Sequence, residues 1–90
     1  MRFEWDSGKA ALNKRKHGVT FDEASECFED PLAIVLDEPA HPERLILIGE
    51  SRASRLIFTV YAERSAGSVR IISARLATRR ERRVYEEVEG

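Results

Sequence analysis

Four runs rich in apolar and β-branched residues fill most of the chain after residue 31, and each run is typical of a β-strand. The predicted strands span residues 32–38, 44–50, 55–64 and 68–75, and a short opening strand is predicted over 3–5. The links SRAS and SAGS between the later strands are short and turn-like. Because short turns join antiparallel neighbours, the sequence predicts an antiparallel meander.

Two helices are predicted before these strands. Asp6 is a good N-cap for the segment SGKAALNKRKH, and Gly18 follows it as a helix stop. Thr20 and Glu23 form a capping box, in which each residue can satisfy a backbone donor of the other. This second helix should end at the dipeptide DP. Its apolar face holds Phe21, Ala24, Cys27 and Phe28.

A second capping box, Thr78 and Glu81, predicts a C-terminal helix that extends to about Glu89. The order of elements predicts an α+β fold with two N-terminal helices, an antiparallel meander sheet and a C-terminal helix. A chain of 90 residues suits a single domain over residues 1–90.

The composition of the chain indicates the cellular compartment in which we expect the protein. The sequence holds no apolar run of membrane-spanning length, and its first residues lack the pattern of a signal peptide. A single cysteine, Cys27, cannot form an internal disulfide, which fits a reducing environment. We therefore expect a cytoplasmic protein with no membrane association.

Charge is distributed unevenly along a chain whose net charge is only −1. Residues 1–43 carry a net charge of −5, whereas residues 44–83 carry ten arginines, no lysine and a net charge of +7. Arginine can bind phosphate or carboxylate groups through two parallel hydrogen bonds. The net charge alone argues against a nucleic-acid partner, but the arrangement favours one surface for an anionic ligand.

The last two predicted strands contain the first candidate residues. With a two-residue turn at Ala66-Gly67, Glu63 would face Arg70 as a structural ion pair. A slip of one residue in register would reverse the grouping of side chains on the two faces. The face opposite that pair would hold Arg64, Ser73 and Arg75.

Arg64 and Arg75 each end a face of otherwise apolar or small residues, and two interpretations are open. The stem of each arginine could cover the core while its head reaches water. Alternatively, each guanidinium could stabilise the charge that develops on a scissile phosphate. The second interpretation makes both arginines candidate catalytic residues.

Four arginines crowd the start of the C-terminal helix, where the helix dipole disfavours each exposed cation by about 0.3–1 kcal/mol. A bound anion would reverse this penalty, because free backbone N–H groups and arginines would converge on it. Glu86 and Glu87 could instead neutralise two of the cations. The predicted phosphate-binding residues are Arg79, Arg80, Arg82 and Arg83.

His17 ends the first predicted helix. Histidine exchanges protons near neutral pH, so His17 is a candidate general acid or base, with a helix-capping role as the alternative. The two histidines and Cys27 lack the spacing of metal ligands, and no glycine-rich phosphate loop is present. Phosphoryl chemistry would therefore use no metal or cofactor, and on RNA it would proceed by attack of the 2′-hydroxyl.

The chain resembles the BrnT family of type II toxin–antitoxin systems in four ordered segments: FEWD (3–6), NKRKHGVTFDEA (13–24), FEDP (28–31) and RIISARLATRRERRVYEE (70–87). The resemblance implies a small ribonuclease with a RelE-like fold, in which helices precede a curved antiparallel sheet. For the site, it implies that Lys16 or His17 transfers protons. The motif positions that it offers for phosphate binding are Ser73, Arg64, Arg75, Arg79 and Arg80.

The resemblance also implies partners. They are an RNA substrate, a BrnA-type antitoxin, and a second toxin copy within a complex of two toxins and two antitoxins. Operator DNA would be bound only through the antitoxin, which should cover the basic surface with acidic or apolar groups. The sequence thus predicts a metal-independent endoribonuclease toxin. Two alternatives stay open, namely a non-catalytic module that binds nucleic acid or protein through the same arginines, and an inactive family member.

Overall fold

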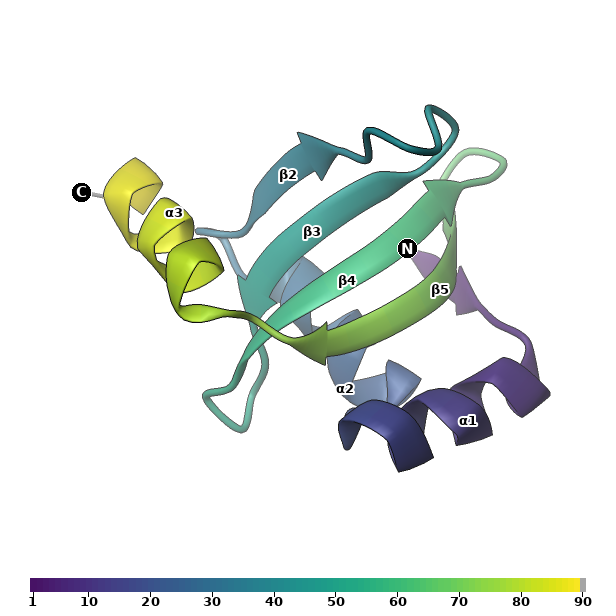
Figure 1. The fold of residues 1–90 in the computed structure, drawn as a ribbon. Helices are drawn as coiled ribbons and strands as arrows, with labels where there is room; N and C mark the ends of the chain where they lie inside the picture. The colour runs from purple at the N-terminus through teal and green to yellow at the C-terminus, as the bar shows by residue number, and fades with distance from the viewer. Residues whose placement is uncertain (90) are drawn as a thin grey trace.

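The predicted meander is present in the computed structural model, which describes residues 1–89 (Figure 1). Its strands lie side by side in the order β1-β5-β4-β3-β2, so the last four strands pair antiparallel in chain order. The strands are β1 (Arg2–Glu4), β2 (Ile34–Asp37), β3 (Leu45–Glu50), β4 (Leu56–Glu63) and β5 (Ser68–Leu76). The helices are α1 (Ser7–His17), α2 (Phe21–Glu26), the 3₁₀ turn η1 (Cys27–Glu29) and α3 (Arg79–Glu89).

The opening strand begins one residue earlier than predicted and pairs with the far end of the chain. β1 runs parallel to β5, with Arg2 opposite Ser68 and Glu4 opposite Arg70. Parallel neighbours need a long connection, and here that connection includes both N-terminal helices and most of the sheet. β1 covers only the first part of the outer edge of β5.

Helix α1 has the bounds that its end signals predict. The Asp6 carboxylate accepts hydrogen bonds from the backbone N–H groups of Gly8 and Lys9, at 2.8 and 3.4 Å. Gly18 ends the helix with a φ of +71°, a left-handed conformation that glycine adopts without a steric penalty.

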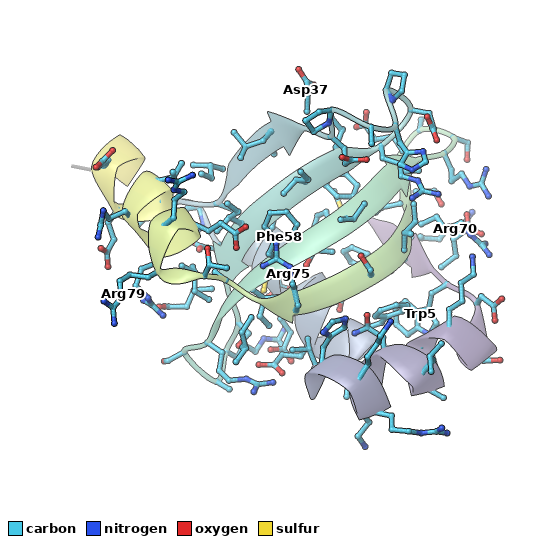
Figure 2. All side chains as sticks on the ribbon, viewed as in Figure 1. Trp5, Asp37, Phe58, Arg70, Arg75 and Arg79 are labelled. Carbon is cyan, nitrogen blue, oxygen red and sulfur yellow. The ribbon has the colours of Figure 1, made fainter. Side chains whose placement is uncertain are left out.

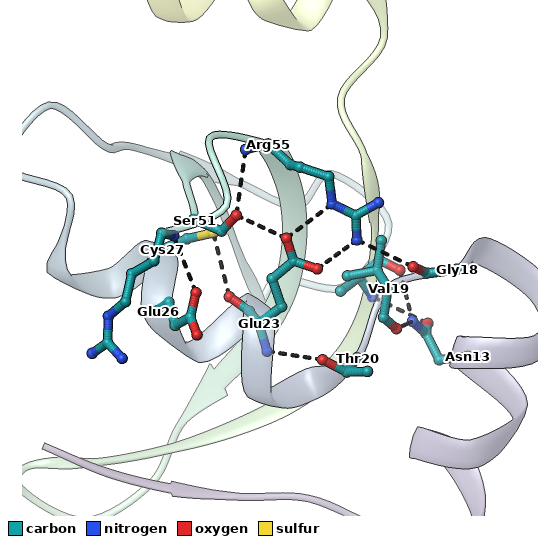
Figure 3. Close-up of polar contacts among 11 residues, drawn as sticks. Asn13, Gly18, Val19, Thr20, Glu23, Glu26, Cys27, Ser51 and Arg55 are labelled. Carbon is teal, nitrogen blue, oxygen red and sulfur yellow. Dashed lines mark hydrogen bonds and ion pairs between the residues drawn. The ribbon is translucent and has the colours of Figure 1, made fainter.

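The capping box of α2 is only half formed, which corrects the prediction. The Thr20 hydroxyl accepts a hydrogen bond from the Glu23 N–H at 3.0 Å, as expected. The Glu23 carboxylate, however, turns towards Arg55 and Ser51 (Figure 3). Charge-assisted hydrogen bonds from a guanidinium are stronger than one from a neutral backbone N–H, so the tertiary partner wins.

This Glu23 network ties three elements together. Arg55 Nε donates to Glu23 Oε2 at 2.9 Å, and Ser51 Oγ donates to the same oxygen at 2.8 Å. Arg55 Nη2 also donates to the carbonyl oxygen of Gly18 at 3.2 Å. The junction between α1 and α2 is thereby fixed against the start of β4.

We predict that Glu23→Gln lowers the free energy of unfolding at neutral pH. The variant should also lose less of its stability when the pH is lowered. The Arg55 hydrogen bond holds the pKa of Glu23 below its usual range. Its stabilisation is therefore present above the unfolded-state pKa and is lost as the pH falls through the folded-state pKa. At neutral pH the expected loss is about 1–2 kcal/mol, which corresponds to a Tm lower by roughly 5–10 °C.

The measurement is Tm as a function of pH between neutral and acid conditions. Glu29→Gln is the control, since Glu29 forms an exposed ion pair with Arg52 and should contribute little. The idea fails if both variants lose stability to the same extent, or if Glu23→Gln keeps the acid sensitivity of the unmodified protein.

The two faces of the sheet are covered by different helices. One face packs against α1 and α2 around Phe21, Ile57 and Ile71. The opposite face packs against α3, but only near β2 and β3, through Tyr85 and Ile48. The part of this second face on β4 and β5 is left half-exposed, and we call it the open face. Its side chains are Phe58, Val60, Ala62, Arg70, Ser73 and Arg75.

The predicted pairing of Glu63 with Arg70 is wrong. The turn has three residues, 65–67, with Gly67 at a φ of +77°, so Glu63 faces Val69 and Arg70 faces Ala62. A β-bulge at Ile72 then restores the predicted register. Ser73 and Arg75 therefore share the open face as predicted, and Arg70 joins them.

Candidate functional site

A pocket of about 350 Å³ lies between α1 and the bulged part of β5. Helix α1 forms one wall, and Ile72 and Ser73 at the bulge of β5 form another. Arg44, the residue before β3, completes the lining. The lining residues are Lys9, Leu12, Asn13, Lys16, His17, Arg44, Ile72 and Ser73.

Asn13 fixes the position of α1 beside β5. Its side-chain amide accepts a hydrogen bond from the N–H of Ala74 at 3.1 Å and donates to the carbonyl of Ala74 at 2.7 Å. It donates as well to the carbonyl of Val19 at 3.0 Å. Asn13 is only 6% exposed. It forms hydrogen bonds with backbone groups at the edge of β5, at a point where β1 no longer pairs with that edge.

The pocket brings together three of the residues proposed from sequence: Lys16, His17 and Ser73. Sequence reasoning missed two others, Lys9 and Arg44. Lys9 could have been found, because it lies seven residues before Lys16 and therefore on the same face of the helix. Arg44 had no comparable signal, since only the sheet places it near α1.

The pocket is electropositive. Its described lining residues include three cations and a histidine but no carboxylate. Arg44 Nε lies 3.7 Å from a carboxylate oxygen of Glu43, which is outside the lining. Converging cations without a carboxylate among them favour an anionic ligand.

Arg75 does not enter this pocket and is held elsewhere on the open face. Its guanidinium donates to both carboxylate oxygens of Glu81, at 2.8 and 2.9 Å, and lies 3.9 Å from the centre of the Phe58 ring (Figure 2). The Arg75 hydrogen bonds lower the pKa of Glu81, so its carboxylate is charged at neutral pH.

Arg64 and Arg70 lie near the hairpin end of the open face. Their side-chain nitrogens are 3.8 and 3.2 Å from the carboxylate of Glu4, which β1 contributes. The backbone of Arg64 is hydrogen-bonded to Ser68. Ser73, which lines the pocket, lies five residues beyond Ser68 along β5, a distance of about 16 Å. Arg64 is therefore separated from the pocket by most of this strand.

The α3 arginines are exposed at the opposite end of the open face from Arg70 (Figure 2). The predicted capping box starts α3, since Thr78 and Glu81 exchange hydrogen bonds at 2.9 and 3.2 Å. Arg82 lines a hollow beside Leu76 that shares no lining residue with the pocket of Lys16 and His17. The phosphate-binding role of Arg79, Arg80, Arg82 and Arg83 stays a prediction.

The single cysteine of the chain is not a candidate nucleophile. Cys27 is fully buried, and its burial raises the pKa of the thiol to about 12. Among the side chains that the structure describes, those of residues 1–87, no three His, Cys, Asp or Glu are grouped closely enough to hold a metal ion. None of the helices described is both long and apolar enough to span a membrane.

Comparisons with known proteins agree on one family. The model of the family described as "Ribonuclease toxin, BrnT, of type II toxin-antitoxin system" matches residues 5–81. A crystal structure of the Brucella abortus ribonuclease toxin BrnT is 31% identical in sequence, with a TM-score of 0.72. The alignment covers 88% of this chain and 99% of that one. No match was found among curated proteins. The chain therefore belongs to the BrnT family of ribonuclease toxins of type II toxin–antitoxin systems.

Proposed function

We propose that this protein is an endoribonuclease that cleaves RNA without a metal ion, in the pocket between α1 and β5. The observation that carries the proposal is the convergence of His17 with Lys9, Lys16 and Arg44 on one pocket. A proton-transfer group and several cations are the parts that 2′-hydroxyl attack on phosphorus needs.

In this reaction the ribose 2′-oxygen attacks the adjacent phosphorus and the bond to the 5′-oxygen breaks. His17 either takes the 2′-hydroxyl proton or supplies one to the 5′-oxygen, and Lys16 or a water molecule carries out the other transfer. The cations stabilise the extra negative charge on the phosphorus-bound oxygens. The products are a 2′,3′-cyclic phosphate and a free 5′-hydroxyl.

The rest of the RNA would follow the open face. Arg70 and Arg64 lie at one end of this face, and Arg79 and the other α3 arginines lie at the other. Cations along a groove or face hold the backbone of single-stranded RNA without reading its sequence. We propose that the fold is RelE-like, since such toxins carry their active surface on the sheet and the C-terminal elements, where this path of the RNA would lie.

A toxin of this family implies an antitoxin. We propose a BrnA-type antitoxin that covers the pocket and the open face with acidic or apolar groups, in a complex of two toxins and two antitoxins. Operator DNA is bound by the antitoxin, and the toxin acts on RNA in the cytoplasm. Covering the cations would remove the surface on which RNA is held.

A specific observation favours a second function, that of a non-catalytic RNA- or protein-binding module. Arg64 and Arg75, the arginines that sequence reasoning placed in catalysis, each lie against a carboxylate, Glu4 and Glu81 respectively. In such a module the pocket would hold a phosphate without breaking a bond.

Cleavage of free RNA in excess EDTA tests the proposal. The antitoxin-free protein should release fragments that end in 2′,3′-cyclic phosphate, because the mechanism uses no metal ion. A 2′-O-methyl oligonucleotide of the same sequence is the control and should stay intact, since it lacks the attacking hydroxyl. The same assay is repeated with RNA on translating ribosomes. If ordinary RNA stays intact both when it is free and when it is on ribosomes, the result would favour the binding module.

A further inference from the structure

Three contacts fix the plane of the Arg75 guanidinium. The guanidinium carbon lies over the Phe58 ring, 3.9 Å from the ring centre, so the ring covers one side of the group. Its two terminal nitrogens donate to the two oxygens of Glu81, and Nη1 donates in addition to the carbonyl of Leu76 at 3.2 Å. Figure 2 shows Arg75 and Phe58 together near the middle of the sheet.

One of the two N–H edges through which Arg75 can bind a phosphate, the pair Nη1 and Nη2, is occupied. Arginine binds phosphate bidentately through paired N–H groups, and here Glu81 receives those hydrogen bonds. Glu81 is itself anchored, because one of its oxygens also accepts the Thr78 N–H at 2.9 Å. At this edge a phosphate would have to displace a carboxylate that is part of the capping box of α3, whereas Nε and Nη2 form a second pair of donors.

The contacts with Phe58, Glu81 and Leu76 do not enclose the Arg75 side chain. The Arg75 side chain keeps 36% of its surface exposed, although the ring covers one side and Glu81 covers an edge. Unpaired RNA bases stack on guanidinium planes as they do on aromatic rings. Ser73, which lines the pocket, is two residues away on the same face, about 7 Å along the strand.

We propose that Arg75, backed by Phe58 and oriented by Glu81, is a stacking platform for an unpaired nucleobase of the RNA. This inference rests on the proposed function for the presence of RNA on the open face, and it deepens that function by assigning a base subsite. It replaces the interpretation of Arg75 as a group that stabilises the reacting phosphate.

Binding of two uncleavable oligomers tests the platform. One is a 2′-O-methyl oligonucleotide, and the other is an abasic oligomer of equal length and charge. The protein should bind the first about tenfold more tightly, since stacking needs a base. Arg75→Lys keeps the charge but loses the plane, and Phe58→Leu removes its support, so both variants should lose this preference.

Salt dependence separates stacking from phosphate contact. If Arg75 stacks on a base, the uncharged variant Arg75→Gln loses the preference for bases while the slope of log K against log salt stays unchanged. If Arg75 contacts phosphate, the slope for Arg75→Gln falls by about 0.7, and affinity for the two oligomers drops equally, which would overturn the platform. Arg52→Gln is the matched control, because Arg52 also donates to both oxygens of a carboxylate, Glu29, but is not one of the open-face residues, so this variant should bind both oligomers normally.

The outcomes also separate the platform from the proposed function. Base-dependent binding that is lost in Arg75→Lys, without cleavage of ordinary RNA, would support the platform and contradict the endoribonuclease. Cleavage with equal affinity for both oligomers would overturn the platform alone. Thermal unfolding of each variant verifies that it is folded.

Discussion

Replacement of His17 by glutamine is expected to lower the rate of RNA cleavage by about 10²–10⁴-fold, which is the usual contribution of a general acid or base. His17 lines the pocket and is exposed, so the change removes proton transfer without disturbing the core. Glutamine keeps a polar side chain but cannot exchange a proton near neutral pH. The measurement is the single-turnover rate of cleavage with excess protein.

Arg15→Gln is the matched control for this variant. Arg15 lies on the same turn of α1 and is exposed, but it is outside the pocket lining. Its replacement should leave cleavage unchanged and weaken RNA binding slightly at most. Unchanged cleavage in His17→Gln would contradict the assignment of the active pocket, and the other lining cations would then need another explanation.

Replacement of Asn13 by leucine is expected to lower the free energy of unfolding by about 3–5 kcal/mol. Leucine has a similar size, but it cannot replace the three hydrogen bonds to Ala74 and Val19. The backbone groups of these residues would then be buried without partners, and each unsatisfied group costs about 1–3 kcal/mol. The measurement is equilibrium unfolding in urea.

The same replacement at an exposed position of α1, Arg15→Leu, should change stability by less than about 0.5 kcal/mol. If Asn13→Leu also lowered the free energy of unfolding by less than about 0.5 kcal/mol, the Asn13 amide would not be needed to satisfy the backbone groups at the edge of β5. A larger loss should come with reduced cleavage in the folded fraction, since Asn13 holds the helix that carries Lys16 and His17.

The ends of the helices could be predicted from the sequence because their signals are local. The Asp6 and Gly18 caps and the Thr78–Glu81 capping box involve residues within four positions of one another, and all of them form. The strands were predictable for a similar reason, because alternation of side chains along one strand reflects a face that must be buried. The meander then followed from its short links.

The candidate site was less predictable, because it combines distant segments. The sequence identified Lys16, His17 and Ser73 individually, but their shared pocket depends on Asn13 and on a bulge at Ile72. Lys9 could have been found from helical spacing, whereas Arg44 could not.

By itself, the sequence determined the elements, the family and the supply of arginines for an anionic surface. Only the tertiary structure decided which charged groups are neutralised. Glu23 leaves its own capping box for Arg55, Glu4 reaches Arg64 and Arg70 from a parallel strand, and Glu81 takes the Nη1–Nη2 edge of Arg75. The physical reason is that a local pattern fixes backbone conformation over a few residues. The partner of a charged side chain, in contrast, is the strongest one within reach after the chain has folded.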